Sequence, residues 1–294
     1  MNPSTPLDPH HVSKLLSRLE QFLPPSRGET DWSASAYRWR TWAGLGASLG
    51  WLQAVYQPHR ISLDDLQNVD AQKAELLRNT EQFVAGRTAN NVLLTGARGT
   101  GKSSLVKAVW NQCAASGLRL VELDRDHLAQ LPEVIERLAE RPERYIVFCD
   151  DLSFEAGDPG YKALKSALDG SISQPPANVL VYATSNRRHL LPEYFSENES
   201  VRHVDGEGHP ADATEEKISL SERFGLWLSF YPFSQDDYLR AVKYWLTYLS
   251  GPQWNDMIER DALNWALARG SRSGRVAWQF ARDASGRATD VSGK

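Results

Sequence analysis

The stretch Val92–Ser104, VLLTGARGTGKSS, decides the fold. An apolar run leads into a glycine-rich turn, and a helical pattern follows from Ser104. The spacing G-x-x-x-x-G-K-[ST] is that of a phosphate-binding loop, whose glycines let backbone N–H groups turn towards phosphate oxygens. The loop consists of Gly96, Ala97, Arg98, Gly99, Thr100, Gly101, Lys102, Ser103 and Ser104. The sequence therefore predicts binding of a nucleoside triphosphate, with Lys102 at the β and γ phosphates and Ser103 helping to hold Mg²⁺.

Composition narrows the class of protein. A hydrophobic content of 41% over 294 residues supports a substantial core. The net charge of −4 gives no global reason to bind nucleic acid. Two cysteines, Cys113 and Cys149, exclude a disulfide scaffold and have no metal-site spacing. No secretory signal is visible, and the most apolar window, Trp42–Tyr56, is too short to span a bilayer, so we expect a cytoplasmic protein without a membrane partner.

Apolar runs of strand length alternate with helical stretches after the first sixty residues. The predicted strands are Val92–Thr95, Leu118–Leu123, Tyr145–Cys149 and Val179–Thr184, and the predicted helices lie near 71–84, 102–115, 127–140 and 161–169. Near-continuous apolar strands with helical crossovers indicate a parallel sheet with helices on both faces, an α/β fold of the P-loop NTPase type. Ligands bind such sheets at the carboxyl ends of the strands.

The flanking regions look different. We predict a helical, tryptophan-rich region over residues 1–61, including a helix near 12–23, before an α/β domain over 62–233. Arginines between the tryptophans would suit base stacking, but packing of the aromatics on the main domain or a partner is favoured, because basic residues are few. Residues 196–220 are predicted to form a polar surface loop. Helices near 234–250, 257–269 and 273–283 predict an α-helical lid over 234–284, with a tail over 285–294.

Polar side chains end two of the predicted strands. Ile146–Asp151 is an apolar strand closed by an acidic pair, which fits a Walker B element. Asp150 would hold Mg²⁺, and Asp151 would orient the attacking water. At the end of the next strand, Asn186 would hydrogen-bond that water or the γ-phosphate, with Thr184 and Ser185 as alternatives.

Arginines follow in two later segments. Arg223, beside the aromatic Phe224, suits a finger that reaches a nucleotide, although a surface salt bridge would also explain it. Arg275 opens the last predicted helix and would point at the phosphates, with Arg272 as the alternative. Arg187, Arg188 and His189 suit either a solvated turn or a contact with a neighbouring subunit.

Together these elements resemble those of AAA+ ATPases. Asp150-Asp151-Leu152-Ser153-Phe154 is similar to the aspartate-pair Walker B of DNA-replication initiators and helicase loaders, and Glu222-Arg223-Phe224 is similar to their arginine-finger box. The wider sequence looks like an uncharacterised bacterial AAA+ family of unknown function. The stretches that carry this resemblance, over about residues 62–283, are NVLLTGARGTGKSS, FCDDLSFE, YATSNRRHLLPE, SERFGLWLSFYP and RSGRVAWQF.

The resemblance implies a role for each matching residue. ATP and Mg²⁺ would be bound by Gly96, Gly101, Lys102 and Ser103, and Asp150 would support the metal. Asn186 would be sensor 1, and Arg275 would be the sensor 2 arginine. Arg223 would be a finger that acts on a neighbouring subunit, and Val69 would form part of the adenine pocket. Asp151 stands where many AAA+ proteins have glutamate, which is one carbon longer, and hydrolysis will be slow if the shorter side chain cannot reach the water. No helix-turn-helix follows the lid, so initiator function is not carried over.

Three hypotheses follow. The first is an ATP-hydrolysing machine that assembles as a homo-oligomeric ring or spiral and remodels or loads an unknown macromolecular partner. The alternative is a slow, nucleotide-switched binding module or scaffold, suggested by Asp151 and the tryptophan-rich region. A small-molecule kinase is the third, against which the lid and Asn186 argue. Nucleic-acid binding is a separate question, raised by the initiator-like motifs and disfavoured by the acidic balance.

Overall fold

The computed structural model describes residues 30–44, 47–154, 158–170, 174–187, 190, 220 and 222–291. The predicted helix near 12–23, almost all of the predicted loop over 196–220, and the pair Arg188 and His189 lie outside the described residues.

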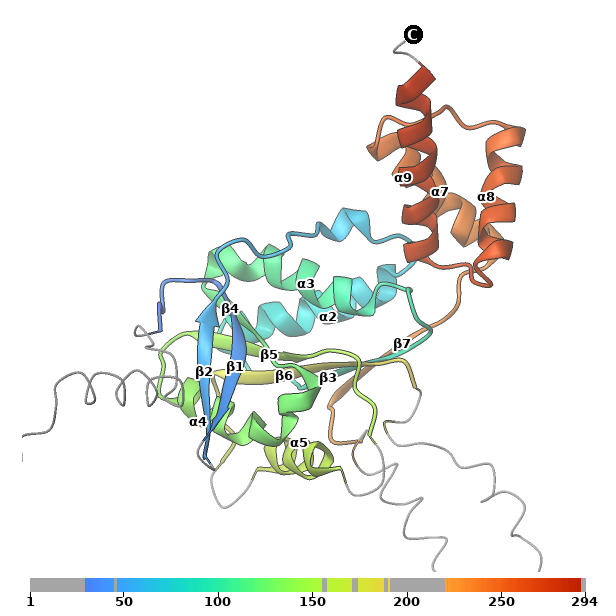
Figure 1. Ribbon diagram of the computed structural model, residues 1–294. Helices are drawn as coiled ribbons and strands as arrows, with labels where there is room; N and C mark the ends of the chain where they lie inside the picture. The colour runs from blue at the N-terminus through green and yellow to red at the C-terminus, as the bar shows by residue number, and fades with distance from the viewer. Residues whose placement is uncertain are drawn as a thin grey trace, which may run out of the picture.

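A mostly parallel sheet forms the centre of the molecule (Figure 1). In the described part of the chain it has seven strands in the order β2-β1-β4-β5-β6-β3-β7. Only β1 and β2 pair antiparallel. The strands are β1 Ala36–Gly44, β2 Ala47–Ala54, β3 Val92–Gly96, β4 Leu118–Glu122, β5 Arg144–Cys149, β6 Val179–Ser185 and β7 Leu226–Phe230. The predicted parallel α/β sheet, including its four predicted strands, is confirmed.

Helices cover both faces of the sheet, as predicted (Figure 1). On one face, α2 (Asp70–Val84) and α3 (Lys102–Cys113) pack on Val92, Leu94, Ile146 and Phe148. On the other face, α4 (Leu131–Ala139) and α5 (Pro159–Asp169) pack on the alternate residues of the same strands, such as Leu93 and Val147. Short 3₁₀ segments, η1 Leu63–Asp65, η2 Ala114–Ser116 and η3 Arg125–Gln130, join these elements. Burial on both faces explains why the strands are apolar along their whole length.

The C-terminal helices form a separate layer with its own core. It contains α7 (Gln235–Tyr248), α8 (Asp256–Ala268) and α9 (Gly274–Val291), so the predicted lid is confirmed. A capping box at Ser234 starts α7, and the Asn255 side chain caps α8. Helix α9 continues beyond residue 284, where we had predicted a tail. None of the helices in the described ranges is long and apolar enough to be a bilayer span.

The tryptophan-rich segment differs from the prediction. Residues 36–54 form a β-hairpin rather than helices, and β1 pairs parallel with β4. In β1 the side chains alternate, since Tyr37 and Trp39 are buried while Arg38 and Arg40 are only partly so. This period of two is typical of a strand, whereas the density of aromatic residues had suggested a helical layer. The sheet therefore begins at Ala36, before the predicted boundary at residue 62.

The aromatic side chains of the hairpin region pack on the main domain. Trp39 is fully buried, its Nε1 donates to Gln130 Oε1 at 2.6 Å, and the Arg137 guanidinium lies 5.1 Å from its ring. Arg38 donates through Nε to Glu122 Oε2 at 2.7 Å. These contacts agree with the packing interpretation of the tryptophans.

Candidate functional site

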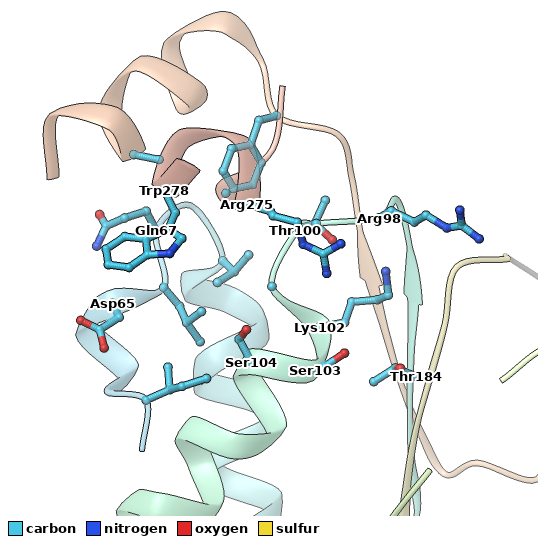
Figure 2. A pocket seen from close by; sticks show the side chains of 18 of the residues that line it. Asp65, Gln67, Arg98, Thr100, Lys102, Ser103, Ser104, Thr184, Arg275 and Trp278 are labelled. Atoms are coloured by element: carbon cyan, nitrogen blue, oxygen red, sulfur yellow. The ribbon is translucent and has the colours of Figure 1, made fainter. Parts of the chain in front are cut away.

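A cleft of about 730 Å³ lies where the phosphate loop, the segment before α2 and the lid meet. Figure 2 shows Lys102, Ser103 and Ser104 at the start of α3, with Arg275 and Trp278 reaching over them from the lid. The carboxyl ends of β3, β5 and β6 supply the rest of one wall, through the loop, Asp150 and Thr184. The cleft is therefore at the edge of the sheet where the sequence predicted a ligand.

The glycines of the loop are required by its backbone. Gly96, Gly99 and Gly101 have φ values of 129°, 77° and 102°, which side chains on L-residues disfavour. A Cβ on Gly96 would lie 1.9 Å from the Phe230 carbonyl oxygen, so this position also needs the space. The chain then enters α3 with Gly101 as its N-cap, which leaves the first N–H groups of the helix at the cleft.

Lys102 is buried and fully hydrogen-bonded within the site. Its Nζ donates to the carbonyl oxygens of Gly96 at 2.8 Å and Ala97 at 2.7 Å, and to Asn186 Oδ1 at 3.0 Å. Only 5% of the residue is exposed. Burial lowers the pKa of Lys102 from 10.5 to about 8, although Asp151 and Asp150 favour the charged form. An ammonium has three donors, so each donor has a partner here.

Ser103 and Asp150 form a pair of oxygen ligands. Ser103 Oγ donates to Asp150 Oδ1 at 2.6 Å, and Thr184 Oγ1 donates to the same oxygen at 2.6 Å. A hydroxyl beside a carboxylate, next to a phosphate loop, is the kind of hard oxygen set that Mg²⁺ prefers. The residues present therefore fit this ion.

Asp151 has an unusual backbone and a defined side-chain partner. Its φ is 53°, in the left-handed region. Its N–H donates to Thr184 Oγ1 at 2.9 Å, and Asn186 Nδ2 donates to its carboxylate. Because Asn186 also accepts from Lys102, its amide links the lysine of the loop to the second aspartate.

The start of α9 is docked on the phosphate loop. The Arg275 N–H donates to the Gly99 carbonyl oxygen at 3.2 Å, and the buried Ser273 caps the helix through its bond to the Val276 N–H. Arg275 lines the cleft, whereas Arg272 is not among the lining residues. This contact brings one of the two candidate arginines to the phosphate end of the cleft.

The opposite wall of the cleft contains apolar and aromatic side chains beside the polar Asp65 and Gln67. Val69, which is 4% exposed, lies there with Leu66 before α2. The lid contributes Trp245, Tyr248 and Trp278, which sequence reasoning missed, although tryptophans spaced along the lid helices were a usable signal. Two hydrogen bonds join this wall to the lid: Tyr244 Oη to Asp65 Oδ1 at 3.0 Å, and Asn68 Nδ2 to the Asp237 carbonyl at 2.8 Å.

The structure brings together most of the predicted site residues. Those that line the cleft are Val69, Arg98, Gly99, Thr100, Gly101, Lys102, Ser103, Ser104, Asp150, Asp151, Asn186 and Arg275. Gly96 and Ala97 are not lining residues but accept hydrogen bonds from Lys102. Arg223 does not line this cleft; its Nε donates to Asp169 at the end of α5. Arg223 therefore makes a salt bridge with Asp169, the kind of contact that is the alternative explanation for this arginine.

The sequence of this chain is similar to one protein family and to parts of several curated proteins. The family described as "Protein of unknown function (DUF815)" matches residues 33–288. Among curated proteins, proteasome-activating nucleotidase 2 of Haloferax volcanii is 30% identical over 166 residues, 47% of this chain and 40% of that protein. A probable 26S proteasome regulatory subunit 4 of Caenorhabditis elegans is 41% identical over 124 residues, 36% of this chain and 28% of that protein. The chain thus matches less than half the length of these relatives.

Solved structures with a similar fold include several AAA+ proteins. A RuvB variant from Thermotoga maritima has a TM-score of 0.51 and 16% identity, covering 79% of this chain and 66% of that one. The AAA domain of FIGL-1 in complex with ADP has a TM-score of 0.51 and 17% identity, covering 80% and 76%. The ORC1 protein of Aeropyrum pernix in complex with DNA has a TM-score of 0.53 and 16% identity, covering 77% and 61%. At these identities the likeness establishes the AAA+ fold.

Proposed function

We propose that this chain, which belongs to the family described as "Protein of unknown function (DUF815)", binds ATP with Mg²⁺, hydrolyses it, and works in a ring or spiral of identical subunits that remodels or loads a macromolecular partner. The observation that carries the proposal is the convergence of Lys102, Ser103, Asp150, Asp151 and Asn186 on one cleft, with Arg275 of the lid above them. Each is a residue type that phosphoryl transfer uses for positioning or charge neutralisation.

The phosphates would be held by the loop and by Lys102. Since all three donors of Lys102 already have acceptors, the ammonium must exchange loop carbonyls for phosphate oxygens when the triphosphate binds. This exchange favours binding, because a phosphate anion compensates a buried cation better than a neutral carbonyl does. Arg275 would add charge from the lid side, which would make lid position sensitive to the nucleotide.

Ser103 and Asp150 would hold Mg²⁺ through the hydroxyl and carboxylate that lie 2.6 Å apart. When bound, the ion neutralises phosphate charge that builds up during transfer. Asp151 would orient the attacking water, while Asn186 holds the Asp151 carboxylate.

A neighbouring subunit would complete the site with Arg223. This residue does not line its own cleft and is bound by Asp169 at the end of α5. An arginine on that surface would stabilise transferring phosphate only in another copy, and fingers of this kind raise turnover by roughly 10³–10⁵. The position of Arg223 thus favours an assembly.

A nucleotide-switched binding module with little turnover is the second candidate. The observation that favours it is Asp151, which is shorter than glutamate and is already bound by Asn186. If its carboxylate cannot reach the water, ATP binding would order the lid, and slow hydrolysis would reset it. The names of the relatives, which include proteasome regulatory subunits, RuvB and ORC1, differ too much to indicate one partner.

Nucleotide binding and phosphate release, measured on matched variants, test the proposal. We expect Lys102→Ala to lose both, and Asp151→Asn to bind ATP without hydrolysing it. Lys162→Ala on the exposed surface of α5 is the control lysine and should behave like the wild type. Turnover in Asp151→Asn equal to that of the wild type would show that another group orients the water. If the wild-type protein binds ATP but hydrolyses it very slowly, and no partner stimulates this hydrolysis, the binding module would be favoured.

A further inference from the structure

We propose that Thr184 is a positioning residue for both acidic residues of the site. Its single hydroxyl fixes the Asp150 carboxylate and the backbone of Asp151 in the arrangement that Mg²⁺ binding requires. The inference rests on the proposed function, since it concerns how the same cleft holds Mg²⁺ with the nucleotide.

The Thr184 hydroxyl makes two hydrogen bonds to consecutive residues. It donates to Asp150 Oδ1 at 2.6 Å and accepts from the Asp151 N–H at 2.9 Å. A hydroxyl has one hydrogen and two lone pairs, so one group can make both bonds at once. Thr184 is 1% exposed and branched at Cβ, which restricts the hydroxyl to few directions.

These bonds fix the orientation of the Asp150 carboxylate. Oδ1 of Asp150 receives hydrogen bonds from Ser103 Oγ at 2.6 Å, Thr184 Oγ1 at 2.6 Å and the Asp151 N–H at 3.1 Å. Ser103 approaches from α3 and Thr184 from β6, so the carboxylate is held between two elements. Without the hydroxyl on the β6 side, Oδ1 would keep only its bonds from Ser103 and the Asp151 N–H, and the carboxylate would be held less firmly in the position in which it meets Ser103.

The backbone of Asp151 needs the same support. Its φ of 53° is disfavoured for a residue with a side chain, and such conformations persist when surrounding bonds hold them. The Leu152 N–H donates to the Thr184 carbonyl at 2.7 Å, and Ser185 Oγ donates to the Leu152 carbonyl at 2.7 Å. The end of β6 thus holds the whole turn, and the Thr184 hydroxyl bonds to both acidic residues.

Thr184 and Asn186 therefore have separate tasks. Asn186 donates to the Asp151 carboxylate and accepts from Lys102, whereas Thr184 binds the Asp150 carboxylate and the Asp151 backbone. A purely space-filling role for Thr184 would be served equally by valine, which has nearly the same shape. The hydroxyl is the feature on which the inference depends.

The gain in ATP affinity that Mg²⁺ provides is the measurement that tests this role. Calorimetry with excess Mg²⁺ and with a chelator would give the gain for the wild type and for the Thr184→Val, Thr184→Ala and Thr184→Ser variants. We expect the valine and alanine variants to lose about tenfold or more of the gain, while affinity in chelator changes by less than about threefold. The serine variant, which keeps the hydroxyl, should recover most of it. Thermal unfolding of the nucleotide-free proteins shows that each variant is folded.

Ser185→Ala is the matched control, because it removes a hydrogen bond from the same turn without touching Asp150. It should leave the Mg²⁺ gain at the wild-type value. A full gain in Thr184→Val, or an equal loss in Ser185→Ala, would overturn the role of the Thr184 hydroxyl. A wild-type protein that binds no nucleotide would overturn the proposed function, and this inference with it.

Discussion

Gly99 of the phosphate loop faces Ser273 of the lid so closely that a Cβ on Gly99 would lie 2.7 Å from the Ser273 hydroxyl oxygen. The same Cβ would lie 3.3 Å from that of Arg275, whose N–H donates to the Gly99 carbonyl. The lid therefore rests directly on the backbone that would cradle the phosphates.

Gly99→Ala should weaken nucleotide binding by separating the lid from the loop. The added methyl group would push away the Ser273 hydroxyl that caps α9 and would crowd the Cβ atoms of Ser273 and Arg275, which loosens the contact between the loop and the start of α9. We expect ATP affinity to fall by about tenfold or more, measured by calorimetry with Mg²⁺ present. Gly117→Ala is the control, since Gly117 also has a positive φ, 93°, but a Cβ there meets nothing within 4 Å. Both variants carry a backbone cost of about 1–2 kcal/mol, so equal affinities would contradict the steric argument.

ATP affinity should fall as pH rises above about 8, because burial lowers the pKa of Lys102 to about 8. Phosphate binding requires the charged ammonium, which the free protein keeps below that pH and loses above it. Above this pH, Lys102 of the free protein must take up a proton before it can bind phosphate, so the affinity decreases by up to about tenfold per pH unit. Calorimetric titrations of ATP in chelator between pH 7 and 9.5 would measure the slope. Lys102→Met should bind weakly and show no such slope, and a flat wild-type profile would mean that Lys102 remains charged throughout.

Mixing two inactive variants should restore hydrolysis if Arg223 acts on a neighbouring subunit. Lys102→Ala lacks the phosphate contact and Arg223→Ala lacks the finger, but a mixed interface can combine an intact cleft with an intact arginine. We expect each variant alone to have less than about 1% of wild-type turnover and equimolar mixtures to recover a clear fraction. Phosphate release at several mixing ratios would measure it. An assembled Arg223→Ala protein with undiminished turnover would rule out the trans-acting role.

Trp39→Ala should destabilise the fold without changing the site directly. The side chain is fully buried and bonded to Gln130, and such truncations cost about 3–5 kcal/mol of unfolding free energy. Urea denaturation would measure the loss, and ATP affinity at a temperature where the variant is folded should stay within about threefold of the wild type. Tyr56→Ala, at a residue that is 75% exposed, is the aromatic control and should be nearly neutral. A stable Trp39→Ala protein would contradict the packing role of the hairpin.

The sheet and the loop could be predicted because their signals are local. The glycine spacing around Lys102 and the apolar runs of β3 to β6 each reflect a backbone requirement that lies within a few residues. The acidic strand end at Asp150 and the polar end at Asn186 followed, since parallel strands bring their carboxyl ends to one edge.

The hairpin and the details of the cleft could not be predicted with the same arguments. Residues 36–38 join the main sheet by pairing with residues 120–122, a long-range contact that no local sequence pattern predicts. The hydrogen bonds that link Lys102 to Asn186 and Asn186 to Asp151 depend on the directions of side chains at the ends of three different elements. Arg223 was placed by its motif, but Asp169 as its partner depends on the end of α5 lying beside it.

The parallel pairing of β1 with β4 also has a consequence for synthesis of the chain. A hairpin can form as soon as β2 has left the ribosome, but the edge of β1 that pairs with β4 stays unpaired until Glu122 has been made. During that interval the face of the hairpin that carries Tyr37 and Trp39 has no helix to cover it. In the finished sheet β2 is the edge strand and β1 lies between β2 and β4. The hairpin therefore covers the edge of β4, which could otherwise pair with another chain. While residues 55–122 are being made, the hairpin therefore has an unpaired edge and an uncovered apolar face, both of which favour association with other chains.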